Sequence, residues 1–332
     1  MIDPSRPLRP LPSSPRPPAP VAAQPADGAA KLSQSPSPEL LLSAATAKGQ
    51  ALPTLALNLA AEVQPSDWGD VTVAERQANL KQLQSLAHDL KARNTPGVEL
   101  WSKLTQAAVA AYEGRQLAPG RKSDFVMQDL SIALVGGDAL KHLQSYLKLP
   151  WVRRPDPMVN TFMRDWALMG VPPADQNWER VGWAGDKLDR HRCADFRPEI
   201  NDGSENQIYH TLFYQFMAYT TQAPFTIHGG SLVHEIRDNG TSSEDHNAAF
   251  VGMSTGMAMR RMRDGAQPET SLREWPVITR AAYGKGGGPD LATSERARIT
   301  DQGIRHLLGN KPLAWKAQNL LIDTVKEVKS WF

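Results

Sequence analysis

A mainly α-helical, multi-helix globular domain behind a disordered N-terminal arm is the fold class that this sequence predicts. Three observations carry the prediction: an opening rich in proline and serine, apolar residues that recur at helical spacing over most of the remainder, and few stretches that alternate as strands do. Residues 224–233 are the best candidate for a short extended piece. Hydrophobic residues make up 41% of the 332-residue chain, which is enough for a sizeable core.

The N-terminal arm is predicted from its composition. Eleven of the first 38 residues are proline and six are serine, and the first aromatic residue of the chain is Trp68. Such a segment cannot bury enough apolar surface to offset the entropy that ordering would cost. We therefore expect residues 1–66 to be a disordered arm and residues 67–332 to be the helical domain, with a subdivision of that domain near 150–203 as the alternative.

Caps and breakers mark the helices of the domain. Thr72 followed by Glu75 has the pattern of a capping box, and the leucines that follow repeat at helical spacing. The Asn-Thr-Pro-Gly run at 94–97 ends this helix, because the residue before a proline avoids the α conformation. A second helix then begins, and residues 170–203 are expected to form a long ordered loop. Further helices are predicted at about 124–135, 138–148, 157–169, 204–221, 243–264, 291–308 and 312–331.

Charge and cysteine content exclude several classes of function. The chain has 37 basic and 35 acidic side chains, whereas nucleic-acid binders normally show a basic excess on one face, so no nucleic-acid partner is expected. No run of about 18 apolar residues lacks charge, so no membrane span is expected, and no Sec-type signal peptide is visible. The single cysteine, Cys193, excludes an internal disulfide framework and fits folding in a reducing compartment.

The densest group of polar residues lies between residues 202 and 247. Gln207 and His210 are three residues apart on an apolar helix, so they share one face, and when buried they need hydrogen-bond partners. Gly252 and Gly256 in the helix at 243–264 permit another backbone to come close. We therefore expect this helix to pack against the one at 204–221, which would bring Asp245 near one end of it.

This cluster predicts a hydrolase-like acid–base site if the protein is an enzyme. Glu205 or Glu235 would be the general acid or base and His210 would assist it. Asp238 or Asp245 would orient the imidazole. The competing interpretation is a core histidine whose hydrogen bonds are satisfied inside the fold.

No metal and no cofactor are expected. The His234-Glu235-x-x-Asp238 run lacks the second histidine of the zinc-protease helix. The glycine-rich run at 283–289 lacks the following Ser or Thr and the preceding strand of a nucleotide-binding loop, so we expect a flexible linker there. The basic run at 260–263 is expected to be a solvated helix end, where cations suit the helix dipole.

Two resemblances bear on function. The Asn206-Gln207-x-x-His210 run, followed by an acidic segment and a glycine-containing helix, resembles an Asp-Asn-Gln-x-x-His-Phe motif of uncharacterised bacterial proteins; here Glu205 replaces the leading Asp and Thr211 the Phe. The opening is similar to the N-termini of type III effectors of Gram-negative bacteria, especially of plant pathogens. That resemblance implies virulence, export from the bacterial cytoplasm into a host cell, a host or target-cell protein as partner, and a secretion chaperone on the arm.

Two other functions remain as alternatives. The domain could be a non-catalytic helical interaction module that binds a host protein through the surface around Trp178 and Trp183. The chain could also be a cytosolic bacterial protein with a disordered tail.

Overall fold

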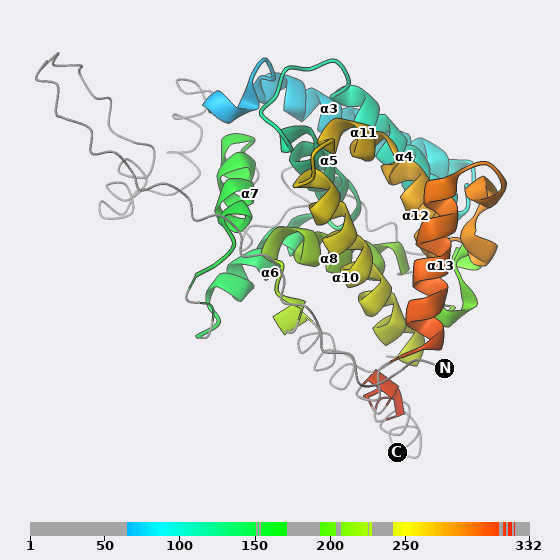
Figure 1. Ribbon diagram of the computed structural model, residues 1–332. Helices are drawn as coiled ribbons and strands as arrows, with labels where there is room; N and C mark the ends of the chain where they lie inside the picture. The colour runs from blue at the N-terminus through cyan, green and yellow to red at the C-terminus, as the bar shows by residue number, and fades with distance from the viewer. Residues whose placement is uncertain are drawn as a thin grey trace, which may run out of the picture. The chain divides into compact units, whose positions relative to one another are not determined.

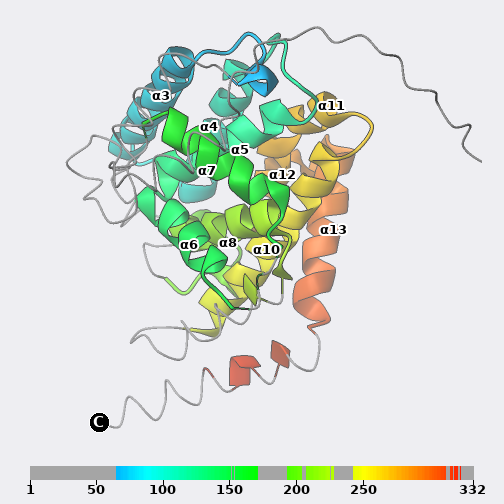
Figure 2. The same cartoon turned by 90° about the vertical axis from the view of Figure 1, so that its left-hand side faces the viewer.

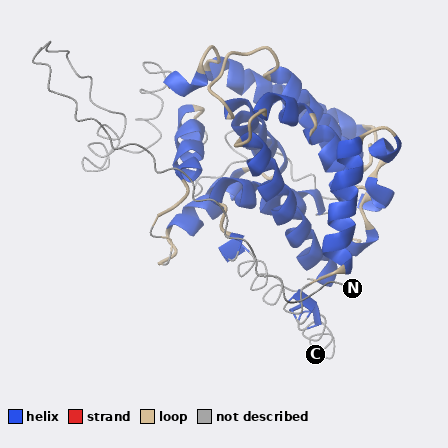
Figure 3. Cartoon of the chain, viewed as in Figure 1, coloured by secondary structure: helices blue, strands red, loops and turns tan. Residues whose placement is uncertain are grey.

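The computed structural model is built from helices. It describes residues 65–150, 152, 154–170, 193–203, 207–224, 226–227, 242–311, 315–316, 318–320 and 322, which belong to one compact unit, Lys48–Phe332. Within these residues Figure 3 shows helices and no strand, and one isolated β-bridge joins Phe196 to Gly284. The predicted mainly α-helical fold is therefore confirmed. Of the arm predicted at residues 1–66, residues 1–64 lie outside the described residues, and residues 65 and 66 are described, the latter as the start of a 3-10 turn. The disorder of the arm and the domain boundaries stay predictions.

The first helices begin where the caps predict. A 3-10 turn, η1 (Ser66–Trp68), precedes α3 (Val73–Ala92) and α4 (Gly97–Ala111). The Thr72 hydroxyl accepts a hydrogen bond from the backbone N–H of Glu75 at 3.2 Å, and the Glu75 carboxylate accepts one from the backbone N–H of Thr72 at 2.8 Å. This reciprocal pair is the predicted capping box, and it satisfies two donors that a helix start leaves unpaired.

The helix α5 (Arg121–Leu134) lies at the centre of the fold. Every residue of it except Lys122 is buried, and it contacts α3, α4, α6, α8 and α11. The helices α6 (Gly137–Leu147) and α7 (Pro157–Leu168) follow, and Asp156 caps α7 by accepting the backbone N–H of Met158 at 2.9 Å. A central helix with polar residues on it must pair those residues with other helices, and this requirement shapes the interior described below.

The helices α8 (Gln207–Thr221) and α10 (Ser243–Arg263) form the most extensive helix pair among the described elements, and they lie side by side in Figures 1 and 2. A Cβ atom on Gly252 would lie 2.5 Å from the carbonyl oxygen of Thr211. One on Gly256 would lie 2.1 Å from the carbonyl oxygen of Gln215. The backbones therefore touch at these two positions, as the glycine spacing predicts.

The segment after α10 differs from the prediction. Two short helices, α11 (Pro268–Arg273) and α12 (Trp275–Tyr283), were not expected, and α13 (Glu295–Gly309) is shorter than predicted. The flexible linker predicted at 283–289 is wrong. Its glycines form a 3-10 turn, η5 (Lys285–Gly287), between α12 and α13, and another, η6 (Pro289–Ala292), follows. A Cβ atom on Gly287, which has φ +81°, would lie 2.5 Å from Asp301 Oδ1, so tight packing explains that glycine.

The predicted extended piece at 224–233 is also wrong where it is described. Residues 224, 226 and 227 are helical, and the backbone N–H of Ile227 donates to the carbonyl of Ala223 at 3.1 Å. Residues 228–233 lie outside the described residues. No helix in the described part of the chain is long and apolar enough to cross a membrane.

Candidate functional site

The α8–α10 contact brings His210 and Asp245 together. Nδ1 of His210 lies 3.4 Å from Oδ1 of Asp245, close enough for an ion pair when the imidazole is protonated. The His210 side chain is 13% exposed and that of Asp245 is 6% exposed. The pair, called here the dyad, therefore lies at the edge of the core, with the imidazole nearer to the surface than the carboxylate.

The carboxylate of the dyad is held from two sides. Ser242 caps α10, and its hydroxyl accepts the backbone N–H of Asp245 at 3.2 Å, which fixes the first turn of the helix. On α8, Nε2 of Gln207 donates to Asp245 Oδ1 at 3.0 Å and also donates to the side chain of Asp202. Gln207 thus links two carboxylates and orients the one that faces His210. An imidazole oriented by a carboxylate is an arrangement that enzymes use for general-base catalysis.

Three predicted site residues, Glu205, Glu235 and Asp238, lie outside the described residues, so their roles stay predictions. The same is true of Trp178 and Trp183. Across the part of the chain that the structure describes, no group of three or more His, Cys, Asp or Glu side chains is placed to hold a metal ion. Cys193 is buried in the 3-10 turn η3 (Cys193–Asp195).

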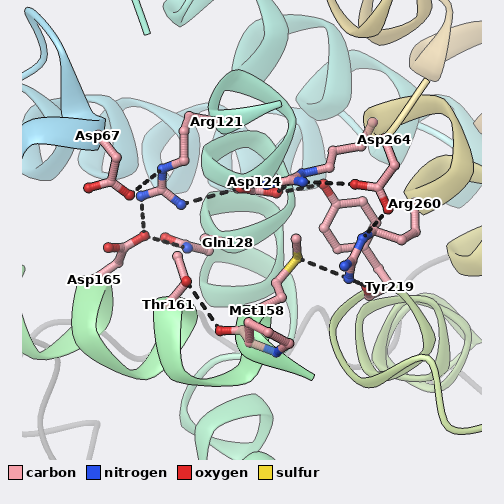
Figure 4. Close-up of polar contacts among 12 residues, drawn as sticks. Asp67, Arg121, Asp124, Gln128, Met158, Thr161, Asp165, Tyr219, Arg260 and Asp264 are labelled. Atoms are coloured by element: carbon pink, nitrogen blue, oxygen red, sulfur yellow. Dashed lines mark hydrogen bonds and ion pairs between the residues drawn. The ribbon is translucent and has the colours of Figure 1, made fainter. Parts of the chain in front are cut away.

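A second polar cluster, which the sequence did not predict, lies inside the fold and is shown in Figure 4. We call it the buried charge network. Its centre is Asp165 on α7, which is wholly buried. The carboxylate accepts hydrogen bonds from Trp68 Nε1 at 3.1 Å, Arg121 Nη2 at 2.6 Å, Gln128 Nε2 at 2.9 Å and Arg164 Nη2 at 2.8 Å. One aspartate therefore joins η1, α5 and α7.

Asp67 extends the network to the surface. Its carboxylate lies 3.1 Å from Nε of Arg121 and 2.7 Å from Nη2 of Arg164. Each of these two arginines thus contacts both Asp67 and Asp165.

Asp124 on α5 connects the network to α8 and α10. It accepts the hydroxyl of Tyr219 at 2.9 Å and two hydrogen bonds from Arg263, at 3.0 and 2.8 Å. The neighbouring Arg260 is buried, and its Nη1 donates to the carbonyl of Tyr219 at 3.0 Å. The prediction that this basic run is a solvated helix end is therefore wrong for these two arginines. They lie inward because a carboxylate and a carbonyl on other helices face them.

The other aspartate of α5, Asp129, joins that helix to α3. It accepts Nη2 of Arg76 at 2.6 Å and the hydroxyl of Tyr112. The Arg76 guanidinium is fully buried and lies 3.9 Å from the centroid of the Phe125 ring, a cation–π contact.

The pKa directions show how firmly the network holds its charges. Burial alone would raise the pKa of Asp165, but the guanidinium groups of Arg121, Arg76 and Arg164 outweigh it and lower the pKa below its ordinary value. Burial and the charge of Asp124 raise the pKa of Tyr219 well above its ordinary value. Near neutral pH the aspartate is thus held ionised and the phenol is held neutral. In these charge states Asp165 and Tyr219 pair helices.

A signal for part of the network was present in the sequence. Arg121, Asp124 and Gln128 are spaced three and four residues apart, so they form a polar stripe on one face of α5. Their partners could not be read in the same way, since Arg263 lies 139 residues from Asp124 in the chain.

A cavity of about 690 Å³ lies beside the network, lined by Leu117, Pro119 and residues 263–270. Its charged residues already have partners: Arg263 pairs with Asp124, Asp264 lies 2.8 Å from both Arg260 and Arg263, and Glu269 lies 2.8 Å from Nζ of Lys122. The cavity therefore offers no unpaired charge to a ligand, and the dyad remains the candidate site.

Family models, curated proteins and solved structures were all compared with the chain, and none of them matches it.

Proposed function

We propose that this chain is a bacterial effector, exported from the bacterial cytoplasm into a target cell, whose helical domain is a hydrolase. His210 is the general base and Asp245 orients it. The observation that carries the catalytic part is the 3.4 Å contact between His210 Nδ1 and Asp245 Oδ1. The proposal of export rests on the arm, whose composition resembles that of type III effectors.

The chemistry follows from the two side chains. A neutral imidazole accepts a proton from water or from a substrate hydroxyl, and the imidazolium that forms is stabilised by the facing carboxylate. Histidine suits this task because its ordinary pKa of about 6.5 lies near neutral pH. General-base catalysis contributes on the order of 10²–10⁴ in rate, so removing the imidazole should remove a measurable activity almost completely.

The catalytic part is tested with three variants of the full chain, His210→Ala, Asp245→Asn and, as the control, His88→Ala on the exposed side of α3. The full chain and each variant are expressed in target cells and scored for growth, and the purified proteins are assayed on p-nitrophenyl esters, phosphates and glycosides. The two dyad variants should lose the cellular effect and any hydrolysis while keeping the helical circular dichroism signal; His88→Ala should behave as wild type. Full cellular activity in a folded His210→Ala protein would contradict the catalytic role.

The export part is tested separately. Residues 1–66 are fused to a reporter enzyme that works only in the host cytosol and are expressed in a bacterium with a functional type III system. Reporter signal that disappears in a secretion-deficient strain is the expected result. Equal signal from the two strains, or none from either, would favour the cytosolic alternative.

A non-catalytic interaction module is the second candidate, and one observation favours it. Gln207, Asp245, His246 and Asn247 are all buried, as in a polar network that serves to specify packing. On this alternative the domain binds a host protein, and His210→Ala keeps its cellular effect as long as it folds. The growth assay therefore separates the two candidates. A secretion chaperone on the arm stays a prediction under either.

A further inference from the structure

The first turn of α10 is held by a second set of contacts that do not involve α8. They come from the described residues 315–316, 318–320 and 322, called here the Trp315 segment. Nε1 of Trp315 donates to Asn247 Oδ1 at 3.1 Å, and Nδ2 of Asn319 donates to the same oxygen at 2.9 Å. On the other side of the amide, Asn247 Nδ2 donates to the backbone carbonyl of Glu199 at 2.8 Å. One side chain thus joins three segments.

Aromatic packing strengthens this attachment. The Trp315 ring is 1% exposed and stacks on Phe250 of α10, with ring centroids 3.7 Å apart and planes at 16°. The neighbouring His246 is fully buried, and its Nε2 lies 3.5 Å from Oε1 of Gln318. Two consecutive residues of α10, His246 and Asn247, therefore both contact the Trp315 segment.

The position of these residues gives the contacts a consequence for the dyad. Asp245, which faces His210, directly precedes His246 and Asn247 in the same helical turn. The ends of helices open more readily than their centres because their first N–H groups have no partner within the helix. A first turn attached on both sides keeps the Asp245 carboxylate at a fixed angle to the imidazole.

We propose that Asn247 and Trp315 are positioning residues of the dyad: by attaching the first turn of α10 to the Trp315 segment, they set where Asp245 lies relative to His210. This inference rests on the proposed function for its catalytic meaning, since neither residue touches the reacting atoms. The geometric claim is independent of any substrate. Loss of the attachment turns Asp245 away from Nδ1 of His210 and weakens the dyad without removing either member of it.

The test reads the dyad directly by NMR on the full chain labelled with ¹⁵N-histidine. The His210 signals are assigned by their absence in His210→Ala, and the ring nitrogens report which of them carries the proton. With Asp245 in place, the proton of the neutral ring is expected on Nδ1. Trp315→Ala and Asn247→Ala should move at least a third of the population to the other tautomer, and Asp245→Asn gives the reference for complete loss.

Two further variants keep the test decisive. Trp315→Phe retains the ring that stacks on Phe250 and removes the N–H donor to Asn247, and it should give a smaller shift in the same direction. Leu320→Ala, a change at a 69% exposed residue of the same segment, should leave the tautomer population at the wild-type value. If Trp315→Ala cannot be purified folded, Trp315→Phe and Asn247→Ala decide the question.

The positioning role is overturned if Trp315→Ala and Asn247→Ala keep the wild-type tautomer population, even if these variants are less stable. If Trp315→Ala does not fold, the same result in Trp315→Phe and Asn247→Ala overturns it. The outcome is distinct from failure of the proposed function. That failure would appear as full cellular activity of His210→Ala, whereas the NMR measurement needs no activity. If the positioning residues shift the tautomer and also reduce the cellular effect, both proposals are supported together.

Discussion

The buried charge network and the dyad differ in how their charges are paired. In the network, Asp165 and Asp124 each contact two arginines and at least one neutral donor, and most of these groups lie away from solvent. In the dyad, the Asp245 carboxylate contacts the imidazole of His210, which is 13% exposed, and accepts a hydrogen bond from the neutral amide of Gln207. Both clusters join helices that are distant in the chain. Several ion pairs around one buried carboxylate hold helices together. The His210–Asp245 pair lies at the edge of the core, where the imidazole could exchange a proton with a substrate.

The largest expected effect comes from breaking the network at its centre. Asp165→Ala removes the carboxylate that Arg121 contacts at 2.6 Å, in a site that is closed to solvent, and leaves Arg121 with its longer contacts, at 3.1 Å to Asp67 and 3.3 Å to Asp124. Removing one partner of a buried ion pair costs about 3–5 kcal/mol, because the remaining charge stays desolvated. Urea denaturation should show a loss of this size in the free energy of unfolding. The control, Glu269→Ala, removes a 66% exposed carboxylate and should change it by less than about 1 kcal/mol. Equal losses in the free energy of unfolding for the two variants would mean that solvent reaches Asp165 as it reaches Glu269.

The second effect concerns the helix pair that carries the dyad. Gly256→Ala places a methyl group 2.1 Å from the carbonyl oxygen of Gln215, so α8 and α10 must separate, and overpacking of this kind costs about 1–3 kcal/mol. Gly303→Ala in α13 is the matched control, because a Cβ atom there has no neighbour within 4 Å. It should stabilise the protein by about 0.5–1 kcal/mol through helix propensity alone. Thermal unfolding measures both variants: the melting temperature should fall for Gly256→Ala and rise for Gly303→Ala.

The third effect is the pH dependence that the network imposes. The pKa of Asp165 is lower in the folded state than its ordinary value of about 3.9. Its stabilising contribution is therefore present above about pH 3.9 and is lost as the pH falls through the lower, folded-state pKa. The free energy of unfolding, measured by urea denaturation between pH 6 and pH 2.5, should fall less steeply for Asp165→Asn than for wild type, by up to about 1.4 kcal/mol per pH unit. A profile for Asp165→Asn that runs parallel to that of wild type would show that Asp165 keeps the same pKa when the protein unfolds.

The smallest effect on stability is expected at the dyad itself. His210 lies at the edge of the core, and Asp245 keeps its hydrogen bond from Gln207 when the imidazole is removed, so His210→Ala should lower the free energy of unfolding by about 1 kcal/mol. The same variant should abolish the cellular effect. A loss of stability as large as that of Asp165→Ala would place His210 among the groups that hold the fold together and would remove the contrast between the two clusters.

Local signals in the sequence predicted much of the fold. The Thr72–Glu75 capping box and the Asn-Thr-Pro-Gly run set the bounds of α3, because each acts within one helical turn. Gly252 and Gly256 predicted the α8–α10 contact and, through it, the meeting of Asp245 with α8. Two positions sufficed there, because glycines four residues apart lie on the same face of a helix.

The remaining features depend on contacts that local patterns do not encode. The helices α11 and α12 are too short to show a clear apolar period, and α12 starts at a Trp-Pro pair that also suits a turn. Asp67 and Arg164 are 97 residues apart in the chain, and the sequence around each residue carries no pattern that predicts their contact. The Trp315–Asn247 contact of the positioning proposal spans 68 residues in the same way.

The burial of Cys193 has a practical consequence. It is the single thiol of the chain and is 6% exposed, so a cysteine introduced on the surface would be the one readily reached by a maleimide reagent. Two such cysteines, one on the exposed side of α13 and one beside the Trp315 segment, would carry a pair of spin labels without background. The distance between the two labels, measured by pulsed electron paramagnetic resonance, would show whether the Trp315 segment moves relative to α13 when substrate candidates are added.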